Sequence, residues 1–382
     1  ATPAQRGARP PNQGRLAGDA AMGRLIWLVL ALLVALVIPL WLGGGESIAR
    51  LRQFPLPQLL GMFAMIIGCW LINSLRIRLL LGEHRSELGP LKSLGVVIST
   101  EFAMCATPGG SGGPLTLMAL LARNGIRPAQ GSAVFAMDQL SDLVFFLCAL
   151  VGILLYALFH SLSPRLEWLL GLSAVSMVGG VISGWAVVHF HRRLIRLAGL
   201  ALKAMKVSAT TRRRWARRLL RFLAAFSATL KLPRSTLLGV FALTSLHWLL
   251  RYSVLYLALR GLGGEVQWAW SFLIQMLSLT AGQFSLAPGG AGAAELTSAA
   301  LLAPMVGTST AAAAILIWRA VTYYFYLLAG APVFLLMVGK PLLKRLFQGR
   351  QAAHPAPVSV PINAPRLENQ YHPRHPARPG RN

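Results

Sequence analysis

Six charged residues lie within long apolar stretches of the sequence: Glu101, Asp138, Asp142, Arg251, Glu295 and Arg319. Facing lipid, each would cost roughly 2.5–3.5 kcal/mol on insertion scales, so these side chains should face one another or a wet cavity. Asp138 and Asp142 are four positions apart and so share one helical face. The pattern predicts a polar transport site inside a membrane. An alternative remains open, in which the charges only hold helices together, for instance by pairing Asp142 with Arg319.

Two other arginines, Arg76 and Arg78, lie near the end of an apolar run. Long basic side chains at such a position can extend to the membrane surface while their methylene groups stay in the apolar layer. We therefore expect these two arginines to lie outside the polar site.

Two glycine-rich motifs interrupt apolar segments that would otherwise read as helices. Residues 107–113 read TPGGSGG, and residues 287–293 read APGGAGA. Proline followed by paired glycines ends a helix, and a new helix can begin near 110 and near 290. The free N–H groups of a helix N-terminus favour anions, phosphate above all.

Each break is therefore predicted to contribute three residues to an anion site: Pro108, Gly109 and Gly110 from the first, and Pro288, Gly289 and Gly290 from the second. With Arg251 and Arg319 these residues would form a cationic site for a phosphate head group. The four embedded carboxylates would neutralise that site when it is empty, or carry protons.

The elements that must position these residues are membrane-spanning helices. The chain has 382 residues, of which 55% are hydrophobic and 13% charged. Apolar runs long enough to cross a bilayer occur at 24–42, 58–82, 132–159, 168–190, 234–259 and 310–338. The two interrupted segments, 93–122 and 268–304, come in addition. The fold class expected is an all-α integral membrane protein.

The two halves of the chain resemble each other. LLGMFAM at 59–65 matches LLGVFAL at 237–243, and Trp70 matches Trp248, both at an offset of 178 residues. The two Pro-Gly-Gly motifs follow at an offset of 180. Such self-similarity indicates a duplication. Each half would hold three spans and one broken re-entrant segment, and an odd number of crossings gives the halves opposite orientations, as in the inverted repeats of transporters.

The distribution of basic residues sets the expected domains and topology. Residues 1–23 and 342–382 are expected to be disordered tails, 24–160 the first repeat and 161–341 the second. Within the second repeat, 191–234 interleaves arginines with apolar residues at helical spacing, which predicts a helix lying on the anionic membrane surface. Positive residues gather in both tails and in 191–234. We therefore expect a multi-pass protein of the cell membrane, namely a bacterial inner membrane, with both termini in the cytoplasm.

Several other functions are disfavoured by the sequence. The net charge is +26, yet no aromatic-interleaved groove or zinc-finger spacing points to nucleic acid. The three cysteines form no CxxC pair, so no disulfide framework, metal site or cofactor is expected. Neither glycine-rich motif is followed by the Lys-Ser/Thr of a nucleotide loop, and no nucleophile–base pair is evident. We therefore expect a protein that is not an enzyme.

The second motif carries a family resemblance. APGGAGAAE at 287–295, followed by WRAVTYY at 318–324, resembles the P-GG-G-E … YR-T-y signature of the lysylphosphatidylglycerol synthase transmembrane-region family, over roughly 24–341. The resemblance implies a flippase-like membrane domain, as in multiple peptide resistance factors, with Asp142, Glu295 and Arg319 in its polar site. It also implies no lipid aminoacylation, because only about 40 residues follow the last span and the soluble transfer domain is not expected.

The first half departs from the family pattern. The family often has PGR-GE where this chain has Pro108 to Gly113, and E-R-x-x-D where this chain has Asp138-Gln139-Leu140-Ser141-Asp142. The arginine and glutamate common in the family are therefore missing here.

The leading functional hypothesis is a lipid translocase, a flippase or scramblase for a phospholipid or a polyprenyl-phosphate-type lipid. Its partners would be the lipid head group and the anionic membrane surface, with a homo-oligomer or a lipid-modifying enzyme as further candidates. Without a nucleotide motif, movement would be downhill or coupled to protons or ions. Two alternatives stay open: a membrane subunit assisting a lipid-modifying or glycosyl-transferring enzyme, and a proton- or ion-coupled anion transporter.

Overall fold

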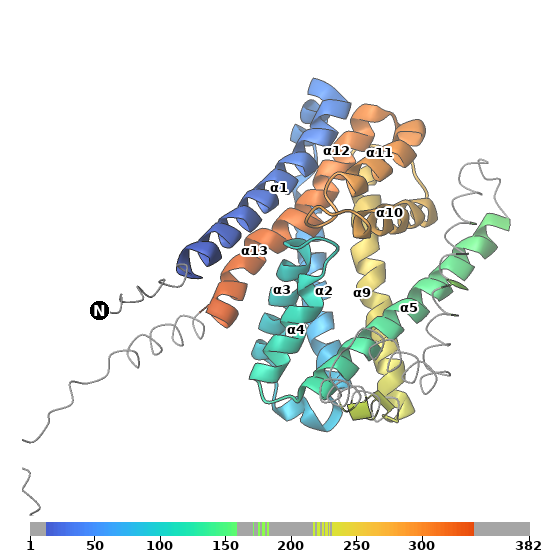
Figure 1. Ribbon diagram of the computed structural model, residues 1–382. Helices are drawn as coiled ribbons and strands as arrows, with labels where there is room; N and C mark the ends of the chain where they lie inside the picture. Colours follow the sequence, from blue (N-terminus) through green and yellow to red (C-terminus); the bar gives the residue numbers. More distant parts are fainter. Residues whose placement is uncertain are drawn as a thin grey trace, which may run out of the picture. The chain divides into compact units, whose positions relative to one another are not determined.

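The computed structural model describes residues 13–158 and 231–339, with isolated positions between 171 and 229. Its first helices are α1 (Gln13–Arg52), α2 (Leu56–Leu80), α3 (Pro90–Cys105), α4 (Gly112–Arg123) and α5 (Pro128–Leu158). A 3₁₀ turn, η1 (Gly82–Ser86), links α2 to α3. Figure 1 shows these helices in blue to green.

After residue 230 the helices continue as α9 (Arg234–Gly261), α10 (Trp268–Gln283), α11 (Ala293–Val306), α12 (Thr308–Arg319) and α13 (Phe325–Phe334). Two π-helical turns, η2 (Ala320–Tyr324) and η3 (Leu335–Gly339), lie before and after α13. No β-strand occurs in 13–158 or 231–339, which agrees with the all-α expectation.

Five of the described helical segments are long and apolar enough to cross a membrane: Leu28–Arg52, Leu56–Leu80, Pro128–Tyr156, Arg234–Gly261 and Thr308–Gly339. They confirm an all-α membrane protein and match five of the six expected spans. The sixth, 168–190, is described only at isolated positions, and so is the expected surface helix at 191–234 apart from its last few residues. The C-terminal tail, 342–382, lies outside the described residues.

The first span is longer than the sequence predicted. We expected it to end at 42 and a loop to follow, but α1 runs on to Arg52. The helix is interrupted only at Gly44, whose φ of 58° is a left-handed conformation that glycine adopts readily. Close packing accompanies this extension, because a Cβ on Gly43 would lie 2.5 Å from the Cβ of Ala312 in α12. Small residues allow this approach of two helices.

Both expected broken segments are present, and their helices have matching lengths. The helices that enter the breaks, α3 and α10, each contain 16 residues. Short helices, α4 and α11, leave them again. Each break places its two paired glycines at positive φ, 56° and 68° in the first and 61° and 69° in the second. The two motifs thus adopt the same local conformation because both have glycines where other residues would be strained.

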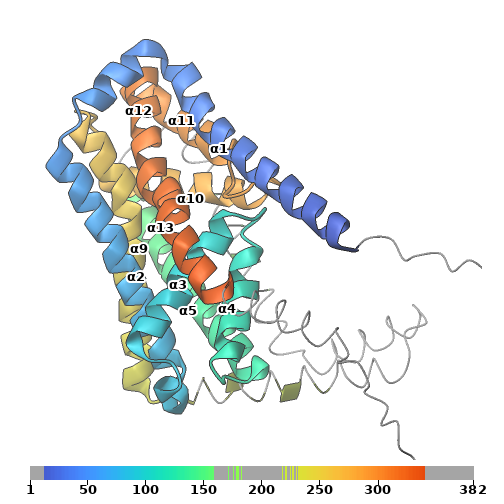
Figure 2. The same cartoon turned by 90° about the vertical axis from the view of Figure 1, so that its left-hand side faces the viewer.

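The two breaks meet each other. Pro108 and Pro288 form an antiparallel bridge. In Figures 1 and 2, the α3–α4 pair lies toward the end of the bundle where α9 begins, whereas α11 lies toward the opposite end. The connecting loops of the two broken segments therefore face each other near the middle of the long helices.

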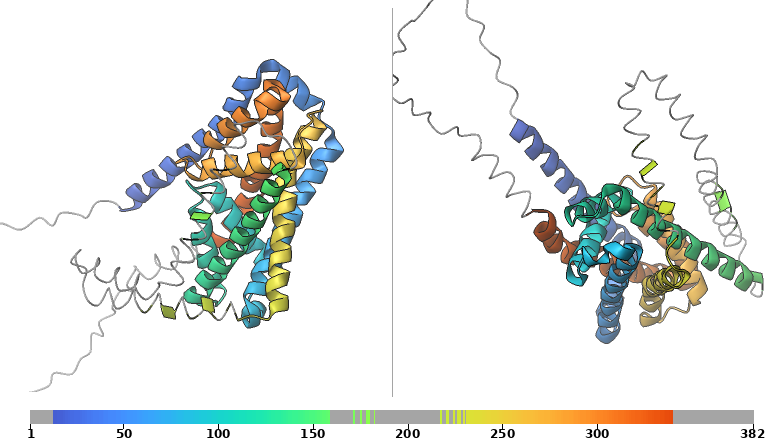
Figure 3. Two further views of the ribbon diagram at one scale, coloured as in Figure 1. Left: turned by 90° about the vertical axis from the view of Figure 1, so that its right-hand side faces the viewer. Right: turned by 90° about the horizontal axis from the view of Figure 1, so that it is seen from below.

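The long helices α2 and α9 pack against each other and run antiparallel. Gln58 near the start of α2 bonds the carbonyl of Leu257 near the end of α9, and Arg76 near the end of α2 bonds Thr244 nearer the start of α9. Between them, Cys69 Sγ donates to the carbonyl oxygen of His247 at 3.6 Å. Figure 3 shows α5 beside α9 on the same part of the bundle. An in-plane two-fold axis relating the halves stays a prediction, and these contacts are of the kind it requires.

Candidate functional site: a polar cavity between the two helix breaks

A cavity of about 80 Å³ lies where the two breaks meet. Both breaks line it, through Gly109 and Gly110 on one side and Gly289 and Gly290 on the other. Polar side chains from three helices complete its wall: Arg251 from α9, Gln275 and Gln283 from α10, and Arg319 from α12. Four of the predicted break residues and both predicted arginines are therefore brought to one place.

Arg319 is held at the cavity by a buried carboxylate. Its Nε lies 2.6 Å from Oε1 of Glu295, and both side chains are almost fully buried, at 3% and 0% exposure. Its Nη1 donates to the carbonyl of Gly289 at 3.4 Å. The guanidinium also lies about 5 Å from the rings of Trp318 and Tyr323. Its Nη2 is buried without a hydrogen-bond partner among the described residues, so part of its donor capacity is unused.

Arg251 has a looser arrangement. Its Nη1 lies 3.4 Å from Oε2 of Glu101 in α3. The guanidinium sits between two aromatic rings, 5.7 Å from that of Trp248 and 5.0 Å from that of Tyr326. Such stacking stabilises a cation whose hydration has been removed. Each cavity arginine thus has one carboxylate partner, and the two pairs are neutral as they stand.

The start of α11 differs from the expectation of an open anion-binding N-terminus. The N–H of Gly292 donates to Oε2 of Glu295 at 2.7 Å, so the helix is capped by its own glutamate. The N–H groups of Gly290 and Ala291 donate to the carbonyls of Ala287 and Pro288 within the turn. At the first break, the N–H of Gly112 donates to Oγ1 of Thr107 at 2.7 Å. These amides already have partners, so the arginines, not the backbone, are the main cationic feature of the cavity.

The role of Glu295 is therefore double. One carboxylate oxygen satisfies the backbone at the start of α11, and the other pairs with Arg319. A carboxylate just after a helix break is stabilised by the helix N-terminus and the nearby guanidinium together. This geometry gives a physical reason for a glutamate in the middle of an apolar segment.

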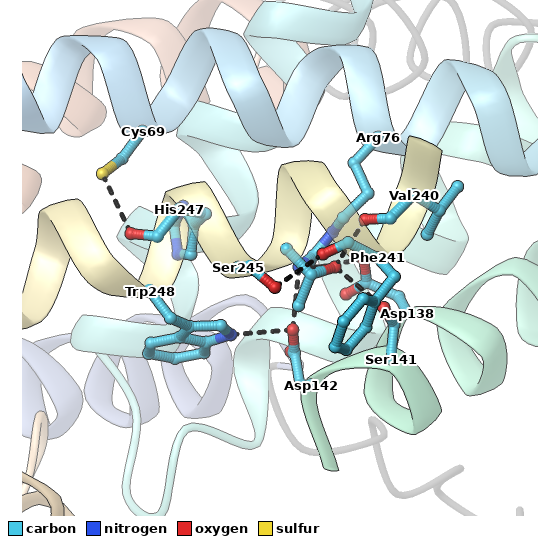
Figure 4. Close-up of polar contacts among 11 residues, drawn as sticks. Cys69, Arg76, Asp138, Ser141, Asp142, Val240, Phe241, Ser245, His247 and Trp248 are labelled. Carbon is cyan, nitrogen blue, oxygen red and sulfur yellow. Dashed lines mark hydrogen bonds and ion pairs between the residues drawn. The ribbon is translucent and has the colours of Figure 1, made fainter. Parts of the chain in front are cut away.

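The aspartates on α5 belong to a second cluster, apart from the cavity wall. Arg76 Nη2 lies 2.6 Å from Oδ1 of Asp138, and its Nη1 lies 2.8 Å from Oδ1 of Asp142. Asp142 also accepts a bond of 2.8 Å from the indole of Trp248. Figure 4 shows these side chains converging between α2, α5 and α9. Thr244 completes the cluster, bonded to Arg76 and to Ser141.

One expectation about this region was wrong, and the pairing given as an example for the alternative is not formed. Arg76 does not reach toward the membrane surface, because it is 4% exposed and pairs with both aspartates. Asp142 pairs with Arg76, whereas Arg319 pairs with Glu295. Two carboxylates four residues apart call for a nearby cation, but only the packing of α2 against α5 shows that this cation is Arg76.

The sequence reasoning also missed polar residues that contribute no charge. Gln275 is 1% exposed and lies at the cavity wall. It is the one amide in the apolar run SFLIQMLSL at 271–279, and this isolation could have marked it. Tyr323 donates from its hydroxyl to the carbonyl of Pro288 at 3.1 Å, in the π-helical turn after Arg319. Turns of this kind occur often at functional sites.

No cluster of three or more His, Cys, Asp or Glu side chains suited to a metal occurs within the described parts of the chain.

The comparisons with known proteins agree with a membrane protein. A "UPF0104 membrane protein" from Archaeoglobus fulgidus is 22% identical over 301 residues, which covers 76% of this chain and 88% of that protein. The family model described as "Lysylphosphatidylglycerol synthase TM region" matches residues 28–330. This match spans every helix that lines the cavity, and the chain therefore belongs to the lysylphosphatidylglycerol synthase transmembrane-region family.

Proposed function

We propose that this protein is a lipid translocase that carries a phosphate-bearing head group through the cavity between the two helix breaks. The lipid would be a phospholipid or a polyprenyl-phosphate-type lipid, with its acyl or prenyl chains remaining in the bilayer. The proposal also places the protein in a bacterial inner membrane, with both termini in the cytoplasm.

The observation that carries this proposal is the pairing of two arginines with two carboxylates around one cavity. When the cavity is empty, Glu295 and Glu101 neutralise Arg319 and Arg251, so that neither cavity arginine is an unpaired charge in the membrane. An arriving phosphate would compete with the carboxylates for the guanidinium groups, which bind phosphate oxygens in a planar fork. Such exchange lets an anion enter and leave without leaving bare cations behind.

A second cavity favours a lipid over a soluble anion. It measures about 470 Å³, is lined mainly by apolar groups, and lies between α5, α9 and α10. Phe272 faces this apolar cavity, and Gln275, one turn further along α10, faces the polar one. Residues three apart lie on the same side of a helix, about 4.5 Å apart along its axis. One face of α10 therefore borders an apolar cavity and, next to it along the helix, a polar cavity. A lipid needs both, because its head group is polar and its chains are apolar.

The polar cavity is small in this conformation. A volume of about 80 Å³ holds several water molecules but is too small for a whole lipid head group. Passage would require the α3–α4 and α10–α11 pairs to separate at the Pro108–Pro288 bridge. Movement of one repeat against the other around a central site is the usual form of alternating access.

The experiment is translocation in proteoliposomes containing phospholipids with a fluorophore on the acyl chain, followed by chemical quenching of the outer leaflet. The purified protein should speed the loss of protected fluorescence, and Arg251→Gln should slow it by tenfold or more. Arg50→Gln is the matched control, because Arg50 forms an exposed pair with Glu46 far along α1. Its rate should equal that of the wild type.

The same preparation separates the alternatives. Transport of inorganic phosphate without movement of lipid would identify an anion transporter instead. Absence of both activities, together with retention of an enzyme during purification from the native membrane, would identify an accessory subunit. In either case the translocase proposal is overturned.

A further inference from the structure

Gln275 is a buried amide at the cavity wall with neither of its polar atoms paired within the described part of the chain. Its side chain is 1% exposed, and neither Nε2 nor Oε1 has a hydrogen-bond partner among the described residues. Exchanging the two amide atoms would not help, because both positions lack a partner. On the same helix, the hydroxyl of Ser278 donates to the carbonyl of Ile274 and accepts from Ser298, whereas the buried hydroxyl of Ser271 also lacks a described partner.

The fold does not require an amide at this place. Gln275 is the eighth residue of α10, and the eighth residue of the equally long α3 is Val97, which is apolar and buried. A buried amide donor or acceptor without a partner loses its hydrogen bonds to water and gains none in return. An apolar residue of similar size would avoid this cost. The glutamine is therefore explained by something that enters the cavity it lines.

The surrounding groups restrict what that ligand can be. Arg319 Nη2 is a second buried donor without a described partner at the same cavity, and Arg251 also lines this cavity. Guanidinium groups take phosphate oxygens. The free Oε1 of Gln275 needs a hydrogen-bond donor, and its Nε2 needs an acceptor. A hydroxyl group supplies both, and it carries no positive charge to be repelled by the two arginines.

We propose that Gln275 is a specificity-determining residue that binds a hydroxyl group on the phosphate-bearing head group. The phosphate is held by Arg319 and Arg251, and the hydroxyl satisfies the carboxamide of Gln275. This inference rests on the proposed function, because it describes the ligand of the same cavity. It predicts discrimination between head groups of equal charge and size that differ only in hydroxyl content.

The test uses two lipids with the same acyl chains, phosphatidylglycerol and phosphatidylpropanol, which differ only in the hydroxyls of the head group. Each is titrated into the purified full-length chain in detergent, and bound lipid is counted by native mass spectrometry. The wild type should bind phosphatidylglycerol about tenfold more tightly, as expected for one or two buried hydrogen bonds. Gln275→Met, which keeps length and removes both polar atoms, should bring the ratio close to one.

Two controls separate a binding role from a structural one. Gln58→Met removes another amide that bonds a backbone carbonyl between α2 and α9, and it should leave the ratio at the wild-type value. Arg319→Gln should weaken both lipids by a similar factor and keep a preference for the hydroxylated one.

The outcomes distinguish this inference from the proposed function. Binding of both lipids with equal affinity by the wild type would overturn the inference alone, and the amide would then be satisfied by water. Unchanged preference in Gln275→Met would overturn it as well. Binding of neither lipid would overturn the inference and the phospholipid form of the proposed function, leaving only a polyprenyl-phosphate-type lipid. Because the first comparison uses the wild type only, it holds even if a variant fails to fold.

Discussion

Pro108 and Pro288 form an antiparallel bridge, although 180 positions separate them and each is the proline of a Pro-Gly-Gly motif. A second contact has the same character, since Cys69 bonds His247 and their separation of 178 is the offset of the repeated helices. Equivalent residues of two copies touch each other only near a two-fold axis. Both contacts are what an inverted repeat would produce at its centre.

The inverted repeat predicts that the loop after α4 in the first half and the loop after α9 in the second half are exposed on opposite sides of the membrane. In a background without the three native cysteines, Asn124→Cys after α4 should react with a membrane-impermeant maleimide only from the cytoplasmic side. Gly263→Cys after α9 should react only from the outer side. The measurement is labelling of intact cells and of inverted vesicles. Labelling of both positions from one side would contradict the inverted arrangement.

The Arg319–Glu295 pair should behave as a unit. Arg319→Met alone leaves a fully buried carboxylate without its cation, which typically costs about 3–5 kcal/mol of stability. The double variant, Arg319→Met with Glu295→Gln, leaves no buried charge and should recover a large part of the lost stability. Glutamine is chosen because its carbonyl oxygen can still accept from the N–H of Gly292. Thermal unfolding in detergent measures the stability, and the translocation assay measures the function.

Recovery of stability without recovery of translocation in the double variant would show that the pair serves binding as well as folding. Full recovery of both would contradict our proposal, because the cationic group would then be dispensable.

The Arg76 cluster should make a large contribution to stability. Arg76→Leu leaves Asp138 and Asp142 facing each other without a cation, and we expect a loss of at least about 3 kcal/mol. Adding Asp138→Asn and Asp142→Asn should restore much of it. Arg78→Leu, two positions away on α2, is the matched control with a small effect. If Arg76→Leu were no more destabilising than Arg78→Leu, the pairing seen here would not hold helices together.

The two Pro-Gly-Gly breaks should tolerate substitution differently. A Cβ on Gly109 would meet nothing closer than a carbonyl oxygen at 3.4 Å. Gly109→Ala should therefore lower the stability by about 1–2 kcal/mol, mainly because alanine is strained at a positive φ. A Cβ on Gly290 would lie 2.6 Å from the Cα of Gly282. Gly290→Ala should therefore cost a further 1–3 kcal/mol or so from overpacking. Unfolding midpoints of the two variants provide the comparison, and equal midpoints would contradict it.

This difference also bears on the purpose of the second motif. A side chain at Gly290 would press against the backbone of α10 before it reached the cavity. Loss of lipid binding in a Gly290 variant would thus report packing between α10 and the break, and substitutions of Arg251 or Gln275 are the more direct probes of the ligand.

Much of this molecule follows from its sequence alone. An apolar run that is long enough to cross a bilayer forms a spanning helix, because its backbone polar groups must form their hydrogen bonds within the segment. Proline with paired glycines must interrupt a helix, and the repeat offset aligns helices of matching length. These are local properties of the chain, so the described spans, the two breaks and the embedded charges were all evident before the fold.

The choice of partners was decided only by the tertiary structure. Pairing Arg76 with Asp138 and Asp142, and Arg319 with Glu295, depends on which helices are neighbours and on how each is rotated. The same holds for the capping of α11 by Glu295, and for the unpartnered amide of Gln275 at the cavity. A charge or an amide in an apolar run indicates that a polar partner is needed. That partner lies on another helix, and only the packing of the bundle brings the two groups within a few ångströms of each other.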